Sequence, residues 1–266
     1  MITLSFSPCP NDTFIFYAIV HGRIDLEGLS FAWETDDVET LNHRAFAGKC
    51  DMIKVSYHAY LTLREQYELL DAGSALGFGN GPLLISRLYR TPEELYDRRV
   101  AIPGEYTTAH LLLKFFAPRI TRKEVMLFSE IEDAINDGRV DAGVIIHENR
   151  FTYQQKGLHK IMDLGEFWQE QTGMPIPLGG IVVKKELGSA VIDKLNRIMK
   201  RSVQYAFDHP DETMAFVRSH AREMDDSVMR KHIGLYVTDF TIDLGKQGKD
   251  AIQKMIEWND RLTSEK

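Results

Sequence analysis

The sequence predicts an α/β protein with two domains, and three observations support this fold class. Short apolar segments with a two-residue period alternate with amphipathic segments of helical period through the first two-thirds of the chain. Glycine, proline and helix-capping residues separate these segments. The 266 residues, 44% of them hydrophobic, are enough for one or two domains with large cores. Such alternation favours mostly parallel sheets with helices on both faces.

The N-terminal part predicts three pairs of a strand and a helix. Ile2–Phe6 is a short apolar alternation, and the helix that follows it is expected to stop at Gly22. Leu29, Phe31 and Trp33 share one face of a period-two pattern, which predicts the second strand. The remaining segments of this part are the strand CDMIKVS and the helices VETLNHRAFAG and YHAYLTLREQ.

The middle of the chain continues the alternation. Strands are expected in LLISRL, RRVAIPG, the stretch from Glu124 to Phe128, AGVII and GGIVVKKE, and helices in TTAHLLLKFFA and EIEDAINDG. Thr91 and Pro92 predict a helix start, because proline suits the first helical position. From Ser189 onward the pattern is almost entirely helical, and this tail is expected to pack on the first domain.

The order of the elements predicts a discontinuous division of the chain. A larger α/β domain is expected from residues 1–86 and 182–266, and a smaller α/β domain from residues 87–181. The segments LLISRL and GGIVVKK would then form two hinge crossings beside a cleft. Periplasmic-binding-protein-like folds of type II have this plan, and they are the fold class that we expect.

Composition and charge argue against several kinds of partner. A net charge of −7 argues against nucleic acid or an acidic membrane, because each calls for a basic patch. No apolar run reaches the ~20 residues of a membrane span, and residues 1–20 do not resemble a signal peptide. Cys9 and Cys50 are the only cysteines, an inventory typical of a cytoplasmic protein. The nine histidines show no metal-binding spacing, so no metal is expected.

Open α/β sheets bind ligands at loops that follow the carboxyl ends of their strands. The first such loop is the corner Ser7–Thr13, in which two prolines hold a helix start rigid. Pro10, Asn11 and Asp12 are therefore candidates for lining the cleft, although a well-capped turn would use the same residues. Cys9 has no base beside it and is expected to be a partly buried, inert thiol.

The second loop comes after the strand CDMIKVS and consists of Lys54, Val55 and Ser56. Ser56 suits the N-cap of the following helix, whose start can bind an anion. Lys54 stands in an otherwise apolar strand and would project near the cleft. The alternative for Lys54 is a surface lysine without a role.

The third loop consists of Thr107, Thr108 and Ala109, which open an apolar helix after Gly104. Glycine permits close approach, and backbone N–H groups with two hydroxyls could hold a carboxylate. A simple helix cap would have the same sequence. The loop is a site candidate because it follows its strand as Ser56 follows the strand of the first domain.

The fourth loop begins with His147, which follows the apolar strand AGVII and is the candidate general base. Histidine exchanges protons near neutral pH, which suits this role. Asp141, Glu148 and Arg150 could orient its ring, and Arg150 is also a candidate for lining the cleft. The alternative is a structural histidine bonded to a backbone carbonyl.

Five segments in order resemble those of one enzyme family. They are SPCPNDTF, DMIKVSYHAY, GEYTTA, VIIHENRFTY and YVTDFTIDLG, and the resemblance runs from residue 2 to about residue 258. The chain is similar in these segments to the 1,4-dihydroxy-6-naphthoate synthases, which act on cyclic dehypoxanthinyl futalosine in the futalosine route to menaquinone.

The resemblance implies a cytoplasmic enzyme with a periplasmic-binding-protein-like fold and without cofactor or metal. It implies a small carboxylate substrate and cleavage of a carbon–carbon bond, with release of the sugar-derived fragment. The residue that corresponds to the family's proton acceptor is His147. Substrate contacts are implied for the segments around Lys54–Ser56 and Thr107–Ala109.

Two other functions are compatible with the sequence. A solute-binding protein of the same fold would capture a small anion without changing it, and fold does not settle function. A chorismate dehydratase of the same pathway would also share the fold, but the segment HENRFTY favours the synthase.

Overall fold

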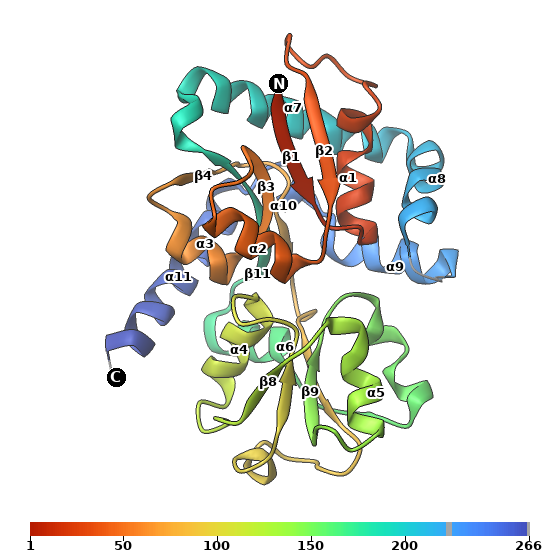
Figure 1. Ribbon diagram of the computed structural model, residues 1–266, viewed down its shortest axis with the longest axis vertical. Helices are drawn as coiled ribbons and strands as arrows, with labels where there is room; N and C mark the ends of the chain where they lie inside the picture. The colour runs from red at the N-terminus through yellow and green to blue at the C-terminus, as the bar shows by residue number, and fades with distance from the viewer. Residues whose placement is uncertain (222–224, 265–266) are drawn as a thin grey trace. The chain divides into compact units, whose positions relative to one another are not determined.

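The computed structural model describes residues 1–221 and 225–264, except for the side chain of Glu148. The chain separates into two compact units (Figure 1). The first consists of Met1–Leu76 and Pro177–Asp250, and the second of Gly77–Ile176 and Ala251–Lys266. These bounds differ from the predicted 1–86 with 182–266 and 87–181 mainly in the last helix, which belongs to the second unit from Ala251 onward.

The sheet of the first unit has six strands in the order β2-β1-β3-β11-β4, with β5 paired to β11. Its central strand pairs are parallel, since β1 pairs with both β2 and β3, whereas β11 runs antiparallel to β3 and β4. The strands are β1 (Ile2–Phe6), β2 (Phe31–Thr35), β3 (Met52–Ser56), β4 (Tyr67–Leu69), β5 (Ala75–Gly77) and β11 (Ile176–Lys184).

The helix α1 packs against α7, α8 and α9 beside this sheet (Figure 1). Phe16 of α1 stacks on Phe6 of β1 with ring centroids 4.5 Å apart, and both side chains lie in one apolar core. The helices of this unit are α1 (Pro10–Val20), α2 (Val38–Phe46), α3 (Tyr57–Leu63), α7 (Ser189–Asp208), α8 (Pro210–His220), α9 (Asp226–Tyr236), α10 (Asp239–Ile242) and the first residues of α11 (Gly245–Ser264). The predicted packing of the helical tail on this unit is therefore confirmed for α7 to α9.

The second unit contains a five-stranded sheet in the order β10-β6-β9-β7-β8. Its strands are β6 (Leu83–Ser86), β7 (Val100–Ile102), β8 (Lys123–Val125), β9 (Ala142–Ile145) and β10 (His159–Asp163). Its helices are α4 (Thr108–Phe116), α5 (Ile131–Asn136) and α6 (Leu164–Thr172). Ile131 and Ile135 of α5 pack with Ile85 and Ile145 of the sheet in a separate core.

Five 3-10 turns complete the described secondary structure. They are η1 (Glu93–Leu95), η2 (Phe128–Glu130), η3 (His147–Phe151), η4 (Tyr153–Lys156) and η5 (Lys185–Leu187). The helix start predicted at Thr91 and Pro92 is only the short turn η1. There the carboxylate of Glu94 accepts the backbone N–H groups of Arg90 and Thr91, so a side chain from within the turn supplies the cap.

Two predictions about the sheets are wrong. Neither sheet is mostly parallel, because β11 and β6 each run antiparallel to the strands that they join. The predicted crossings LLISRL and GGIVVKK each lie inside one sheet: LLISRL contains β6, between β9 and β10 of the second sheet, and GGIVVKK lies in β11 of the first sheet. The short strands β4, β5 and β10 were not predicted, since three to five residues of mixed polarity carry little periodicity.

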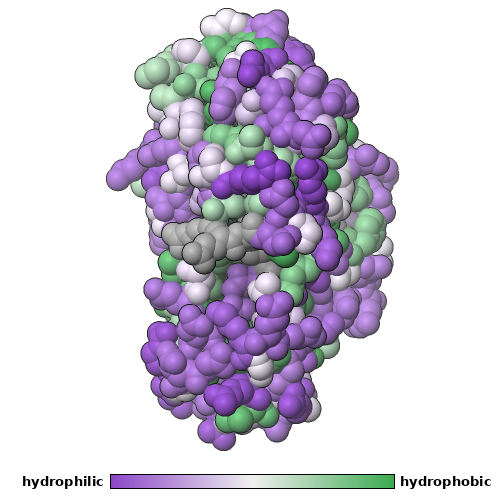
Figure 2. Space-filling model, turned by 90° about the vertical axis from the view of Figure 1, so that its right-hand side faces the viewer, coloured by the Kyte–Doolittle hydropathy of each residue, from purple (hydrophilic) through white to green (hydrophobic). Residues whose placement is uncertain are grey.

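The molecular surface carries few large apolar side chains. Those that are exposed, such as Leu88 and Val125, are scattered along the sequence. The face in Figure 2 is accordingly covered mostly by hydrophilic residues with small hydrophobic groups among them. None of the helices in the described ranges combines the length and apolar character needed to cross a membrane.

Candidate functional site

The candidate residues of the first unit lie at one edge of its sheet. Strands β1 and β3 are parallel neighbours, with Ser5 opposite Ile53, so their carboxyl ends meet at the same edge. The corner from Ser7 to Asp12 follows β1, and Lys54–Ser56 completes β3. Ligands of open α/β sheets bind at this kind of edge.

Lys54 and Asp12 form a buried ion pair at this edge. Lys54 Nζ lies 2.8 Å from Asp12 Oδ1, and the two side chains are only 9% and 1% exposed. The other oxygen of Asp12 accepts hydrogen bonds from the N–H and the hydroxyl of Ser7, at 3.1 and 2.7 Å. Lys54 is therefore not a surface lysine, and the SPCPND corner is joined to β3 through Asp12.

Cys9 is held in the same corner. The Ser7 hydroxyl lies 2.8 Å from its sulfur. Exclusion of water by the surrounding protein raises the pKa of the Cys9 thiol to about 12, and the nearby Asp12 carboxylate adds to this shift. A thiol with such a pKa stays protonated at neutral pH and is a poor nucleophile, as the sequence predicted.

Asn11 differs from its neighbours in its hydrogen bonding. The residue is only 8% exposed, and its amide oxygen has no hydrogen-bond partner in the described part of the chain. A buried polar atom of this kind calls for an explanation, and a ligand or a water molecule that donates to it would supply one.

Ser56 stands at the N-cap of α3, but its side chain makes no capping hydrogen bond. Instead, Asn42 of α2 binds it twice. The Ser56 N–H donates to Asn42 Oδ1 at 3.0 Å, and Asn42 Nδ2 donates to the Ser56 hydroxyl at 3.3 Å. Asn42 was not singled out from the sequence, although an asparagine on the buried face of a predicted amphipathic helix was a usable signal. Val55 is fully buried in the sheet.

The candidate residues of the second unit also share one sheet edge. Strands β7 and β9 are parallel, with Val100 opposite Ala142, so the loop after β7 and the turn after β9 leave the same side. Thr107 is the N-cap of α4, since its hydroxyl accepts the N–H of His110 at 3.3 Å and donates to the Gly104 carbonyl at 2.9 Å. Thr108 and Ala109 form the buried first turn of this helix.

His147 begins η3 directly after β9. Its backbone has φ = 60°, a left-handed value that is rare outside glycine and is often found where function holds a residue in place. Its ring meets the ring of Phe128 at 67° with centroids 4.8 Å apart. The side chain is partly exposed, so the imidazole is not sealed in the core.

The three predicted orienting residues lie in different surroundings. Asp141 precedes β9, whereas His147 follows it. The carboxylate of Asp141 accepts the backbone N–H of Arg99 at 2.9 Å. Arg150 donates to the Gly81 carbonyl at 2.8 Å and to Asp163 at 3.0 Å. The side chain of Glu148 is outside the described residues.

The described residues contain no group of three His, Cys, Asp or Glu side chains arranged to hold a metal ion. The expectation that the protein works without metal or cofactor stays a prediction.

The fold defines a class. The chain is similar to the alkanesulfonate-binding protein SsuA of Xanthomonas axonopodis pv. citri, with a TM-score of 0.69, 11% identity and coverage of 88% of this chain and 83% of that one. It is similar also to the Candida albicans CA3427 gene product, described as having the generic periplasmic binding protein fold, with a TM-score of 0.67, 13% identity and coverage of 96% and 90%. The protein therefore has the predicted periplasmic-binding-protein fold.

Within this class the chain belongs to the menaquinone biosynthesis family, whose model matches residues 2–260. It is 43% identical to the 1,4-dihydroxy-6-naphthoate synthase of Thermus thermophilus over 96% of this chain and 92% of that protein. It is 42% identical to the enzyme of the same name from Streptomyces coelicolor, over 96% of this chain and 91% of that protein. The crystal structure of protein AF1704 from Archaeoglobus fulgidus is 33% identical, with a TM-score of 0.93 and coverage of 98% and 97%. The predicted family resemblance is confirmed.

Proposed function

We propose that the protein is a 1,4-dihydroxy-6-naphthoate synthase of menaquinone biosynthesis. The observation that carries the proposal is the similarity, over almost the full length of both chains, to two curated enzymes of that name. In more detail, we propose a carbon–carbon lyase that converts cyclic dehypoxanthinyl futalosine into the naphthoate and releases the sugar-derived fragment.

His147 is the proton acceptor in this proposal. Its place at the carboxyl end of β9, its partly exposed ring and its left-handed backbone support this role. An imidazole can remove a carbon-bound proton when a neighbouring ketone of the substrate makes that proton acidic. General-base help of this kind contributes about 10²–10⁴-fold in rate. Formation of the aromatic ring then favours breaking the carbon–carbon bond, so the proposal needs neither metal nor cofactor.

Lys54, Val55 and Ser56 contact the substrate in this proposal, with Val55 acting through its backbone because its side chain is buried. An ammonium group has three donors, and Asp12 accepts one hydrogen bond from Lys54. A substrate carboxylate can use the others. Asn11 adds an acceptor for a substrate hydroxyl, because a buried oxygen left without a donor costs about 1–3 kcal/mol.

Thr107, Thr108 and Ala109 are the proposed contacts of the second unit. They occupy the start of α4, where the N-terminal end of the helix dipole favours negative charge. The internal hydrogen bonds of Thr107 hold this start in one conformation, which supports a role in binding a carboxylate without rearrangement.

The test is a direct assay of the purified protein. Cyclic dehypoxanthinyl futalosine should be consumed while 1,4-dihydroxy-6-naphthoate accumulates, as followed by mass spectrometry. The same assay with chorismate should leave chorismate intact. Rapid turnover of chorismate, or binding of the cyclic compound without any product, would contradict the proposal.

A further inference from the structure

The turn that carries His147 is held by the residues around the start of α5. Phe128 of η2, just before α5, places its ring against the ring of His147. Glu132, the second residue of α5, accepts a hydrogen bond from the side-chain amide of Asn149 at 2.8 Å. Asn149 lies two residues after His147 in η3, so the turn is held at two points by the consecutive elements η2 and α5.

Glu132 is unusual for a carboxylate because it is only 2% exposed. Its Oε2 takes the Asn149 amide and the Lys156 ammonium, which is 3.1 Å away, while Oε1 has no partner among the described residues. Lys156 also binds the neighbouring Asp133 at 2.9 Å, and Asp133 is 63% exposed. Because Asp133 is more exposed than Glu132, keeping its carboxylate charged beside Lys156 costs less free energy. The contact that distinguishes Glu132 from Asp133 is the one with Asn149.

His147 itself needs support from its surroundings. A left-handed backbone at a residue other than glycine costs about 1–3 kcal/mol and persists only where neighbouring structure enforces it. The hydrogen bond between Glu132 and Asn149 ties the same turn to a buried helix residue. Loss of this bond would let the turn relax away from the left-handed backbone conformation at His147, and this relaxation would move the imidazole.

We propose that Glu132 is a positioning residue that acts through Asn149 to hold His147 in its working place. The inference rests on the proposed function, since it assumes that His147 removes a proton. A displacement of about 1 Å at a reacting group can lower a rate by about 10²-fold. Replacement of Glu132 is therefore expected to lower kcat without any contact between Glu132 and the substrate.

The experiment compares kcat and KM for five variants. Glu132→Ala and Asn149→Ala should each lower kcat by about 10–100-fold and leave KM within about twofold. Their double variant should lose little more than either single one, because both changes break the same bond. Glu132→Gln keeps an oxygen that can accept the Asn149 amide and should retain most of kcat. Asp133→Asn, the matched control, removes an ion pair to Lys156 but not the bond to Asn149, and its kcat should match wild type.

A second readout reports the position of His147 without turnover. The NMR signals of the His147 ring, assigned by their loss in His147→Ala, should shift in Glu132→Ala and stay in place in Asp133→Asn. If Glu132→Ala does not fold, Asn149→Ala tests the same bond from the turn itself. Unchanged kcat and unchanged ring signals in folded Asn149→Ala, or an equal loss in Asp133→Asn, would overturn the inference.

The outcomes also separate this inference from the proposed function. His147→Ala with near wild-type kcat would contradict the role of His147 itself. Loss of turnover in His147→Ala together with full turnover in Glu132→Ala and Asn149→Ala would contradict only the role of Glu132.

Discussion

Lys54 and Asp12 form an ion pair that is buried at the edge of the first sheet. Both side chains are less than a tenth exposed, and Ser7 completes the hydrogen bonds of the carboxylate. Burying two charges costs several kcal/mol, and good geometry only offsets this cost. The pair therefore contributes more to where the lysine lies than to net stability, and it links the end of β1 to the end of β3.

Lys54→Met should destabilise the protein by about 3–5 kcal/mol, because it leaves the Asp12 carboxylate buried without its cation. Urea unfolding followed by circular dichroism measures the change in the free energy of unfolding. Lys246→Met is the matched control, since its ion pair with Asp250 is solvent-exposed and should be worth less than about 1 kcal/mol. Equal effects of the two substitutions on the free energy of unfolding would show that the buried pair contributes no more to stability than the exposed one.

His147→Ala should bind substrate almost as tightly as wild type and lose about 10²–10⁴-fold in kcat, because it removes the proposed base and leaves the binding loops intact. Calorimetry gives the affinity and mass spectrometry the turnover. His209→Ala, at the exposed end of α7, is a histidine control that should keep wild-type turnover. Near wild-type kcat in His147→Ala would move the base to another residue.

Ion pairs join the helix α7 to the loop between α1 and β2. Arg197 and Arg201 both bind Glu27, at 2.6 and 2.8 Å. Hydrogen bonds from the two arginines lower the pKa of the Glu27 carboxyl to about 2. Glu27 also has a left-handed backbone, with φ = 48°, so the ion pairs hold a residue in a conformation that it would otherwise avoid.

This pKa predicts how stability depends on acid. The carboxyl has a lower pKa in the folded protein than its usual value of 4.5, so its contribution is present above about pH 4.5. It is lost as the pH falls from about 4.5 toward 2. Glu27→Gln should therefore be less stable than wild type at pH 6, and the difference should shrink below about pH 4.5. Thermal unfolding at each pH measures this, and parallel curves for the two proteins would contradict it.

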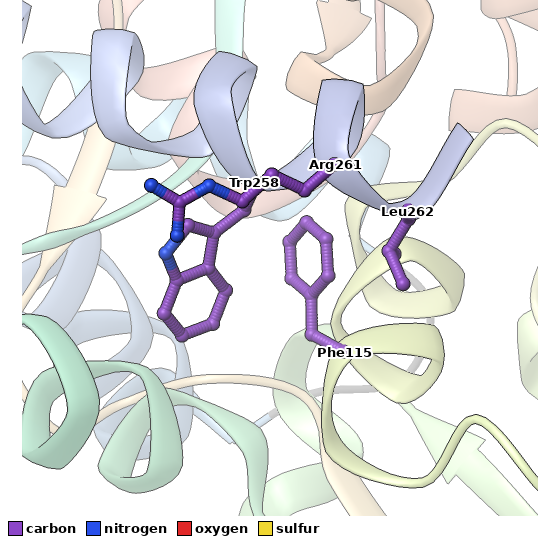
Figure 3. A pocket seen from close by; sticks show the side chains of 4 residues that line it. All are labelled: Phe115, Trp258, Arg261 and Leu262. Carbon is purple, nitrogen blue, oxygen red and sulfur yellow. The ribbon is translucent and has the colours of Figure 1, made fainter. Parts of the chain in front are cut away.

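The chain passes between its two units at three places, after Leu76, after Ile176 and after Asp250. The third passage falls within α11, whose last part returns to the second unit. There the Trp258 ring meets those of Phe115 and Trp168, each with centroids 5.2 Å apart. Figure 3 shows Phe115 pointing from α4 toward α11, where Trp258, Arg261 and Leu262 line a pocket with it.

Removal of residues 251–266 should destabilise the second unit more than the first. The deletion takes away the Trp258 contacts and the buried Ile252 and Met255, and aromatic pairs alone contribute about 0.5–1.5 kcal/mol each. Hydrogen exchange measured by mass spectrometry should show faster exchange in α4 and α6 and little change in α1 and α7. Trp258→Phe keeps an aromatic ring and should show a smaller effect. Faster exchange confined to α1 and α7 would contradict the assignment of residues 251–266 to the second unit.

Much of the fold follows from residue patterns that need only near neighbours. Strand β1 and the strands and helices around Lys54, Thr108 and His147 lie where periodicity and capping residues predict them. The position of His147 at a strand end was predictable for the same reason, because the apolar run AGVII ends there. The family could be recognised from motifs that are each local.

Contacts between distant residues could not be predicted in this way. Asp12 and Lys54 are 42 residues apart, and nothing near either one indicates the other. The antiparallel direction of β11, the bond between Glu132 and Asn149 and the return of Trp258 to the second unit depend likewise on the path of the whole chain. Periodicity specifies which face of an element is apolar, but only the packed chain selects the partner that this face meets.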